Sequence, residues 1–128
     1  MTDTYKIAIV GGTGDLGSGL AKRWARAGHQ IIIGSRNAGR AADTAAQFNE
    51  EAGTISISGL ENADAAAAGE IVVLTVPYEN HALTLEAIKD SVQGKIVVDV
   101  TVPLMPPKVR TVQLPEGGSC AKAAQALL

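Results

Sequence analysis

The feature that most constrains the fold is a glycine-rich turn in residues 6–17, KIAIVGGTGDLG. Residues 6–10 form a short apolar run, as expected of a strand that is buried on both faces of a parallel sheet. Gly12, Gly14 and Gly17 follow with the spacing G-x-G-x-x-G, and a helix is predicted to begin within the turn. A strand before the glycines and a helix after them is the context that a dinucleotide-binding turn requires.

Each of the three glycines is expected to have its own role. Gly12 lets the chain turn sharply out of the strand, Gly14 lets the backbone approach a pyrophosphate, and Gly17 lets the helix pack close to the sheet. The helix N-terminus then offers N–H groups and the positive end of its dipole to the phosphates. We therefore interpret the turn as a dinucleotide site, with a purely structural turn as the alternative.

Composition limits the chain to one domain, residues 1–128. Hydrophobic residues make up 46% of the chain and aromatic residues only 3%, so Ala, Val, Ile and Leu must form the core. The net charge of −2 gives no electrostatic reason to expect nucleic acid as a partner. We see no apolar run long enough for a membrane span and no leader, and Cys120 is the only cysteine, so a reducing cytoplasm is expected.

The remaining periodicity predicts alternating strands and helices. Strands are expected at 30–33, 54–58, 70–76 and 95–100, and helices at 15–27, 38–52, 62–68, 77–92 and 120–128. Residues 101–116 contain four prolines and are expected to form a loop. This pattern is typical of an α/β fold, a Rossmann-type doubly wound parallel sheet with five strands in the order 3-2-1-4-5. Its ligand crevice lies at the carboxyl ends of strands 1 and 4, where the order reverses.

Apolar stripes indicate which helix faces contact the sheet. The expected inward residues are Leu16, Leu20, Trp24 and Ala27 in the first helix, Ala41, Ala45, Phe48 and Ala52 in the second, and Leu85, Ile88 and Val92 in the helix after Pro77. The outer edge of the last strand, residues 96–100, is expected to be apolar and unpaired, which favours association between copies.

The residues after the second strand predict which nucleotide binds. Sites that prefer NAD place an acid there, about 20 residues beyond the glycines, to bind the ribose 2′-hydroxyl. This chain has Ser35 and Arg36 instead, with Arg40 one turn into the next helix. Guanidinium groups pair with a 2′-phosphate, which an acid would repel. The pattern favours NADP(H), with solvated surface arginines as the alternative.

The segments IVGGTGDLGSGLAKRWARAGHQIIIGSR, VVLTVPYE and KIVVDVTVPL resemble the coenzyme F420-dependent NADP oxidoreductase family. The resemblance implies an oxidoreductase that transfers hydride between NADPH and the deazaflavin F420. It assigns three groups of contacts: Thr13, Ser35, Arg36 and Arg40 at the 2′-phosphate end, Gly12, Gly14, Asp15 and Leu16 along the pyrophosphate, and Val76, Pro77, Val102 and Pro103 at the nicotinamide end.

Members of that family have a further C-terminal part, which helps to form the deazaflavin pocket and the dimer. We therefore expect these residues to bind NADP(H), to transfer hydride to F420 only where a partner supplies the missing surface, and to form a dimer or belong to a longer enzyme. The alternatives are an NADP-binding module without activity of its own and the nucleotide domain of an imine or metal reductase. A short-chain dehydrogenase is disfavoured, because neither Tyr5 nor Tyr78 is followed four residues later by lysine.

No catalytic residue is predicted, since hydride transfer between two cofactors depends on placement more than on acid–base chemistry. His81 is interpreted as a helix-surface residue, with a role in the crevice as the alternative, and His29 as a turn residue. Cys120 is expected to be a small buried residue. Tyr78 is expected either to border the nicotinamide or simply to pack. With two histidines and one cysteine, no cluster has the spacing of metal ligands.

Overall fold

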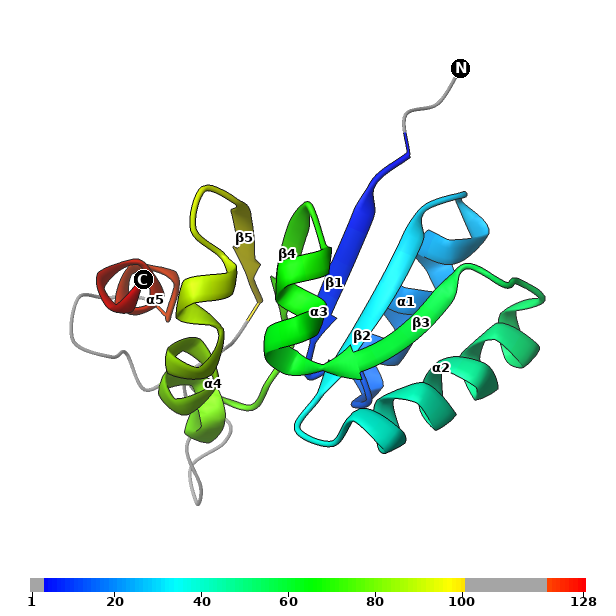
Figure 1. Cartoon of the computed structure of the whole chain (residues 1–128), viewed down its shortest axis with the longest axis horizontal. Helices are drawn as coiled ribbons and strands as arrows, with labels where there is room; N and C mark the ends of the chain where they lie inside the picture. The colour runs from blue at the N-terminus through cyan, green and yellow to red at the C-terminus, as the bar shows by residue number, and fades with distance from the viewer. Residues whose placement is uncertain (1–3, 101–119) are drawn as a thin grey trace, which may run out of the picture.

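The fold is a parallel sheet with helices on both faces, seen in a computed structural model that describes residues 4–100 and 120–128 (Figure 1). The strands are β1 (Lys6–Val10), β2 (Gln30–Ser35), β3 (Ile57–Glu61), β4 (Ile71–Leu74) and β5 (Ile96–Asp99). They pair in parallel in the order β3-β2-β1-β4-β5. This confirms the predicted Rossmann-type sheet and its strand order.

Two layers of helices cover the sheet. The helices α1 (Asp15–Arg26) and α2 (Ala38–Ala52) pack on one face, and α3 (Asn62–Ala68), α4 (His81–Ile88) and α5 (Cys120–Leu127) pack on the other. Alternate side chains of β1 contact the two helix layers: Ile7 and Ile9 face α1 and α2, whereas Ala8 and Val10 face the layer of α3, α4 and α5. The central strands are therefore apolar on both sides, as their sequences predict.

The predicted stripe of α1 is wrong by one position. The buried residues of the helix are Gly17, Ala21 and Ala25, while Leu16 is 52% exposed and Leu20 and Trp24 only flank the core. Close approach of the helix to the turn before it leaves room only for small side chains on the contacting face. Sequence reasoning selected Leu16, Leu20 and Trp24, which lie beside that contact, and Ala27, which is exposed at the end of the helix.

Helix α2 agrees with the prediction more closely. Ala41, Ala45 and Phe48 are buried, Ala52 is half-buried, and Gly53 ends the helix with a left-handed φ of 71°. Lys22 of α1 donates a hydrogen bond of 2.8 Å to Glu51, and this bond lowers the pKa of the Glu51 carboxyl. The two helices are thereby linked on their solvent side.

Strand β3 begins three residues later than the predicted 54–58, because two features outside its hydrophobic pattern fix its register. Asn49 of α2 donates to the carbonyl of Ile57 at 2.8 Å and accepts from its N–H at 3.0 Å. Gly59 packs directly beneath α2, where a Cβ would overlap the carbonyl oxygen of Ala41. Ile55, which the prediction placed inside the strand, is 98% exposed.

The segment predicted as one helix over 77–92 contains three short elements: the 3₁₀ turn η1 (Tyr78–Asn80), α4, and the 3₁₀ turn η2 (Lys89–Ser91). Leu85, Ile88 and Val92 face inward as predicted.

At the far side of the described sheet β5 is an edge strand, and its Ile96 and Val98 are 66% and 42% exposed. Among the described residues, no helix is both long enough and apolar enough to span a membrane.

Candidate functional site

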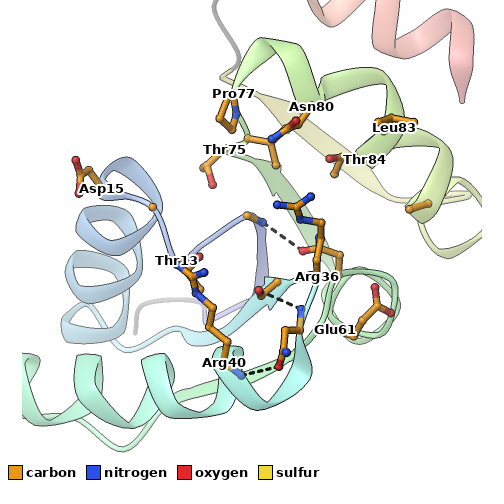
Figure 2. A pocket seen from close by; sticks show the side chains of 17 residues that line it. Thr13, Asp15, Arg36, Arg40, Glu61, Thr75, Pro77, Asn80, Leu83 and Thr84 are labelled. Carbon is orange, nitrogen blue, oxygen red and sulfur yellow. Dashed lines mark hydrogen bonds between the residues drawn. The ribbon is translucent and has the colours of Figure 1, made fainter.

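A crevice of about 620 Å³ lies at the carboxyl ends of β1, β2 and β4, where the strand order reverses. Its size is that of a small-molecule site. Four segments form it: the glycine turn after β1, the end of β2 with the start of α2, the junction of β3 and α3, and the segment from Thr75 to α4 on the opposite side (Figure 2). The predicted position of the ligand crevice is confirmed.

The sharp turn out of β1 is made by Gly11 and not, as predicted, by Gly12. Gly11 has a φ of 75°, a conformation that favours glycine, and its N–H donates to the carbonyl of Gly34 at 3.1 Å. Gly12 lies beneath the turn, where a Cβ would meet the carbonyl oxygen of Ile9 at 2.8 Å. A Cβ on Gly17 would lie 2.6 Å from the Cα of Gly12, so the predicted close packing at Gly17 is confirmed.

Gly14 differs from these glycines because the protein leaves space beside it. The atom nearest to a Cβ there would be the carbonyl oxygen of Gly11, at 3.8 Å. Gly14 lines the crevice and is the N-cap of α1, with extended backbone that any residue can adopt. Asp15 follows, and Figure 2 shows its carboxylate pointing away from the crevice. The turn therefore presents backbone and the positive end of the α1 dipole to the crevice.

The side of the crevice formed by β2 and α2 is basic. Ser35 is buried at the end of β2, and its hydroxyl oxygen accepts from the N–H of Asn37 at 3.3 Å. The side chain of Asn37 caps α2 by accepting from the N–H of Arg40 at 3.0 Å. Figure 2 shows Arg40 extending toward Thr13 of the glycine turn and Arg36 extending toward the α4 side. Both guanidinium groups are solvent-exposed and border the same space.

The opposite side is less polar and is anchored to β1. Thr75 donates both its N–H and its hydroxyl to the carbonyl of Val10, at 3.1 and 3.0 Å. Val76 and Pro77 follow and line the crevice. Along α4, Leu83 is 74% exposed beside it. An apolar side chain left in solvent at the mouth of a crevice is suited to covering a flat ligand surface.

Asn62, at the start of α3, is a part of the site that sequence reasoning missed. It is buried, and its side-chain oxygen accepts from the N–H of Gly11 at 3.3 Å, so it supports the glycine turn from the side of β3. The signal available in the sequence was its place at the start of the predicted helix 62–68, shortly after the predicted strand 54–58. In a parallel sheet such positions gather at the edge where ligands bind.

The structure brings together most of the predicted site residues. Those that line the crevice are Thr13, Gly14, Asp15, Ser35, Arg36, Arg40, Val76 and Pro77. Gly12 and Leu16 do not line the crevice, while Val102 and Pro103 fall outside the described residues. The lining residues that the sequence did not single out are Gly11, Asn37, Glu61, Asn62, Thr75, Asn80, Leu83, Thr84 and Ala87.

The interpretation of His81 as a surface residue is wrong. Its side chain is only 4% exposed, and its Nε2 lies 2.7 Å from Oδ2 of Asp99, which is 3% exposed. The ring of Tyr78 stacks on His81 with centroids 6.4 Å apart, and Tyr78 does not line the crevice, which supports the packing interpretation of that ring. His29 is a turn residue as predicted, since its Nδ1 accepts from the N–H of Tyr5. The side chain of Cys120 lies outside the described part of the chain.

Sequence comparison gives a consistent family match. The profile of the family described as "NADP oxidoreductase coenzyme F420-dependent" matches residues 6–103. A protein from Methanothermobacter thermautotrophicus named F420-dependent NADP reductase is 46% identical over 128 residues, covering 95% of this chain and 55% of that protein. A protein of the same name from Methanocaldococcus jannaschii is 43% identical, covering 96% of this chain and 58% of that protein. The chain therefore spans little more than half the length of these curated relatives.

Solved structures of two reductases share the fold of this chain. The crystal structure of a protein from Arthrobacter sp. FB24, described as an F420-dependent NADP reductase, matches with a TM-score of 0.74 at 27% identity, covering 95% of this chain and 57% of that chain. Pyrroline carboxylate reductase from Plasmodium falciparum with NADP bound matches with a TM-score of 0.59 at 18% identity, over 83% of this chain and 37% of that chain. At that identity the likeness shows a shared fold.

Proposed function

Because the chain belongs to the family of coenzyme F420-dependent NADP oxidoreductases, we propose that its crevice binds NADP(H) for hydride exchange with the deazaflavin F420. The observation that carries the proposal is the meeting of two arginines with a dinucleotide-type glycine turn at one crevice. The residues present fit the nucleotide, since the turn leaves open space at Gly14 and the basic side lies where the adenosine ribose belongs.

In this proposal, Ser35, Arg36 and Arg40 bind the 2′-phosphate. Two guanidinium groups give charge-assisted hydrogen bonds to a dianionic phosphate, and the hydroxyl of Ser35 adds a donor at the end of β2. Thr13 of the glycine turn, toward which Arg40 extends in Figure 2, would contact the same phosphate. The absence of an acidic side chain at the end of β2 removes the group that would favour NAD.

The glycine turn would hold the pyrophosphate. The backbone at Gly14, Asp15 and Leu16 would supply N–H groups at the N-terminus of α1, and Gly12 would keep the turn close to the sheet beneath them. The adenine would lie between Arg36 and the exposed Leu83, which border the same crevice from opposite sides. A base in that position would remove Leu83 from water.

The nicotinamide would lie against Val76 and Pro77, with Val102 and Pro103 nearby by the family resemblance. The nicotinamide supplies the hydride, so the chain itself needs to bind, orient and shield the ring. Thr75 donates two hydrogen bonds to Val10 of β1 and thereby fixes the position of Val76 and Pro77, which follow it. We propose no acid–base residue, since two correctly spaced cofactors need none from the protein.

The proposal that F420 is the second substrate rests on the family alone.

We also propose that copies of the chain associate in a reducing cytoplasm through the β5 edge, where Ile96 and Val98 are exposed. Sedimentation of the wild-type chain and of Ile96→Lys tests the association. A dimer that the lysine disperses supports the proposal, and a monomeric wild-type chain contradicts it.

The function itself is tested by two assays on the 128-residue chain. Titration with NADPH, followed by nucleotide fluorescence, is expected to show saturable binding. Oxidation of NADPH is then measured with F420 and, as a control, with FMN. Reduction of F420 that FMN does not replace supports the full reaction, whereas binding without turnover favours an NADP-binding module. Failure to bind NADPH would contradict both.

A further inference from the structure

The buried pair of His81 and Asp99 is not used by any contact proposed above. The two side chains are 4% and 3% exposed, and Nε2 lies 2.7 Å from Oδ2. An ionised carboxylate only accepts hydrogen bonds, so the histidine tautomer that joins the pair is the one with its proton on Nε2. A protein with apolar residues of similar volume is often as stable as one with a buried ionic pair. A contribution to stability is therefore a weak explanation for this pair.

The pair lies at one end of residues 75–80, which form one wall of the crevice. His81 is the first residue of α4 and Asp99 is the last residue of β5. The connection before His81, residues 75–80, contributes Thr75, Val76, Pro77 and Asn80 to the crevice. The other end of this connection is held by the two hydrogen bonds from Thr75 to Val10. The wall is therefore fastened at both ends, once to β1 and once to β5.

The body of α4 has separate anchors. Leu85 and Ile88 are completely buried in the core between α4 and the sheet. If the bond from His81 were lost, these two residues would keep α4, including Leu83, in place, and the connection before the helix would become less constrained. Arg36 lies in the loop between β2 and α2 and Arg40 lies in α2, so neither belongs to the elements that hold the pair.

We infer that the His81–Asp99 hydrogen bond positions Val76 and Pro77 against the nicotinamide half of the nucleotide, without contributing to the 2′-phosphate half. This inference rests on the proposed NADP(H) site. His81 is a positioning residue: it acts through the connection that it fastens and does not touch the ligand. The Tyr78 ring, which stacks on His81, stiffens the same connection.

The test compares two ligands that share the phosphate end. NADPH reaches both halves of the crevice, whereas adenosine 2′,5′-bisphosphate carries the 2′-phosphate without a nicotinamide. His81→Leu removes the donor, and His81→Gln keeps an amide donor where Nε2 lies. His29→Leu is the matched control, because His29 contacts Tyr5, away from the crevice.

By calorimetry, His81→Leu is expected to weaken NADPH about tenfold and to change the bisphosphate by less than about twofold. His81→Gln is expected to restore most of the NADPH affinity, and His29→Leu to change neither ligand. Equal weakening of both ligands by His81→Leu, no weakening, or no restoration by His81→Gln would overturn the inference. A wild-type chain that binds neither ligand would instead refute the proposed function.

A second measurement applies if His81→Leu does not fold. The chain has two histidines, so ¹⁵N-labelled histidine gives two sets of ring signals. NADPH is expected to shift the signals of His81 and leave those of His29, whereas the bisphosphate shifts neither. His81 signals that NADPH leaves unchanged would overturn the inference in the same way.

Discussion

A side chain added at Gly14 would meet the crevice, whereas one added at Gly17 would meet the protein. The nearest atom to a Cβ at Gly14 is 3.8 Å away, and at Gly17 it is the Cα of Gly12 at 2.6 Å. We therefore predict that Gly14→Val abolishes NADPH binding while leaving a folded domain, because the valine occupies the place of the pyrophosphate. Gly17→Ala should instead lower the melting temperature.

Gly19 is the matched control for both, since it lies in the same helix with no atom within 4 Å of a Cβ. Gly19→Ala is expected to gain about 0.5–1 kcal/mol, the difference in helix propensity, and to leave binding intact. A Gly14→Val chain that binds NADPH like wild type would show that the pyrophosphate does not lie on this turn.

At the scale of elements, the side-chain hydrogen bonds from α2 to β3 come from the amide of Asn49. Asn49 serves both the N–H and the C=O of Ile57, and it also accepts from the hydroxyl of Thr54. Asn49→Ala should cost about 1–3 kcal/mol in urea unfolding, because buried backbone groups lose their partners. Glu51→Gln on the same helix affects only exposed bonds, those from Lys22 and Gln47, and should change little. Equal effects of the two substitutions would contradict this role for Asn49.

At the scale of the whole molecule, ligand binding should appear as stability. A ligand that binds only the folded state at about 100 times its Kd adds about 2.7 kcal/mol to the free energy of unfolding. NADPH is therefore expected to raise the melting temperature more than NADH at the same concentration. Equal shifts would remove the support for a 2′-phosphate site.

The sequence predicted the sheet because its central strands are continuous apolar runs flanked by glycines. It predicted much of the crevice because parallel strands bring their carboxyl ends to one edge, so Ser35 and Val76 had to lie near the glycine turn. The register of β3 could not be read, since it depends on Asn49 and on the packing of Gly59 under α2.

The partner of His81 was equally hidden. Asp99 is 18 residues away and adjacent only through the pairing of β4 with β5 and the turn before α4. Histidine is common on helix surfaces, and neither composition nor periodicity distinguishes a buried one. Leu83 and Thr84, which line the crevice from α4, were missed for a related reason. The hydrophobic pattern of α4 shows the face that contacts the core, and these two residues lie on the other side.

The central claim, that the crevice selects NADP(H) through its basic side, is tested most directly by the affinities of wild type and Arg36→Ala for NADPH and NADH. The substitution should cost about 1.5–3 kcal/mol for NADPH, the range of hydrogen bonds to charged groups, and almost nothing for NADH, which has no phosphate there. Arg23→Ala, which removes an exposed arginine of α1 away from the crevice, should change neither affinity. Equal losses for the two nucleotides with Arg36→Ala, or a wild-type chain that prefers NADH, would contradict the account.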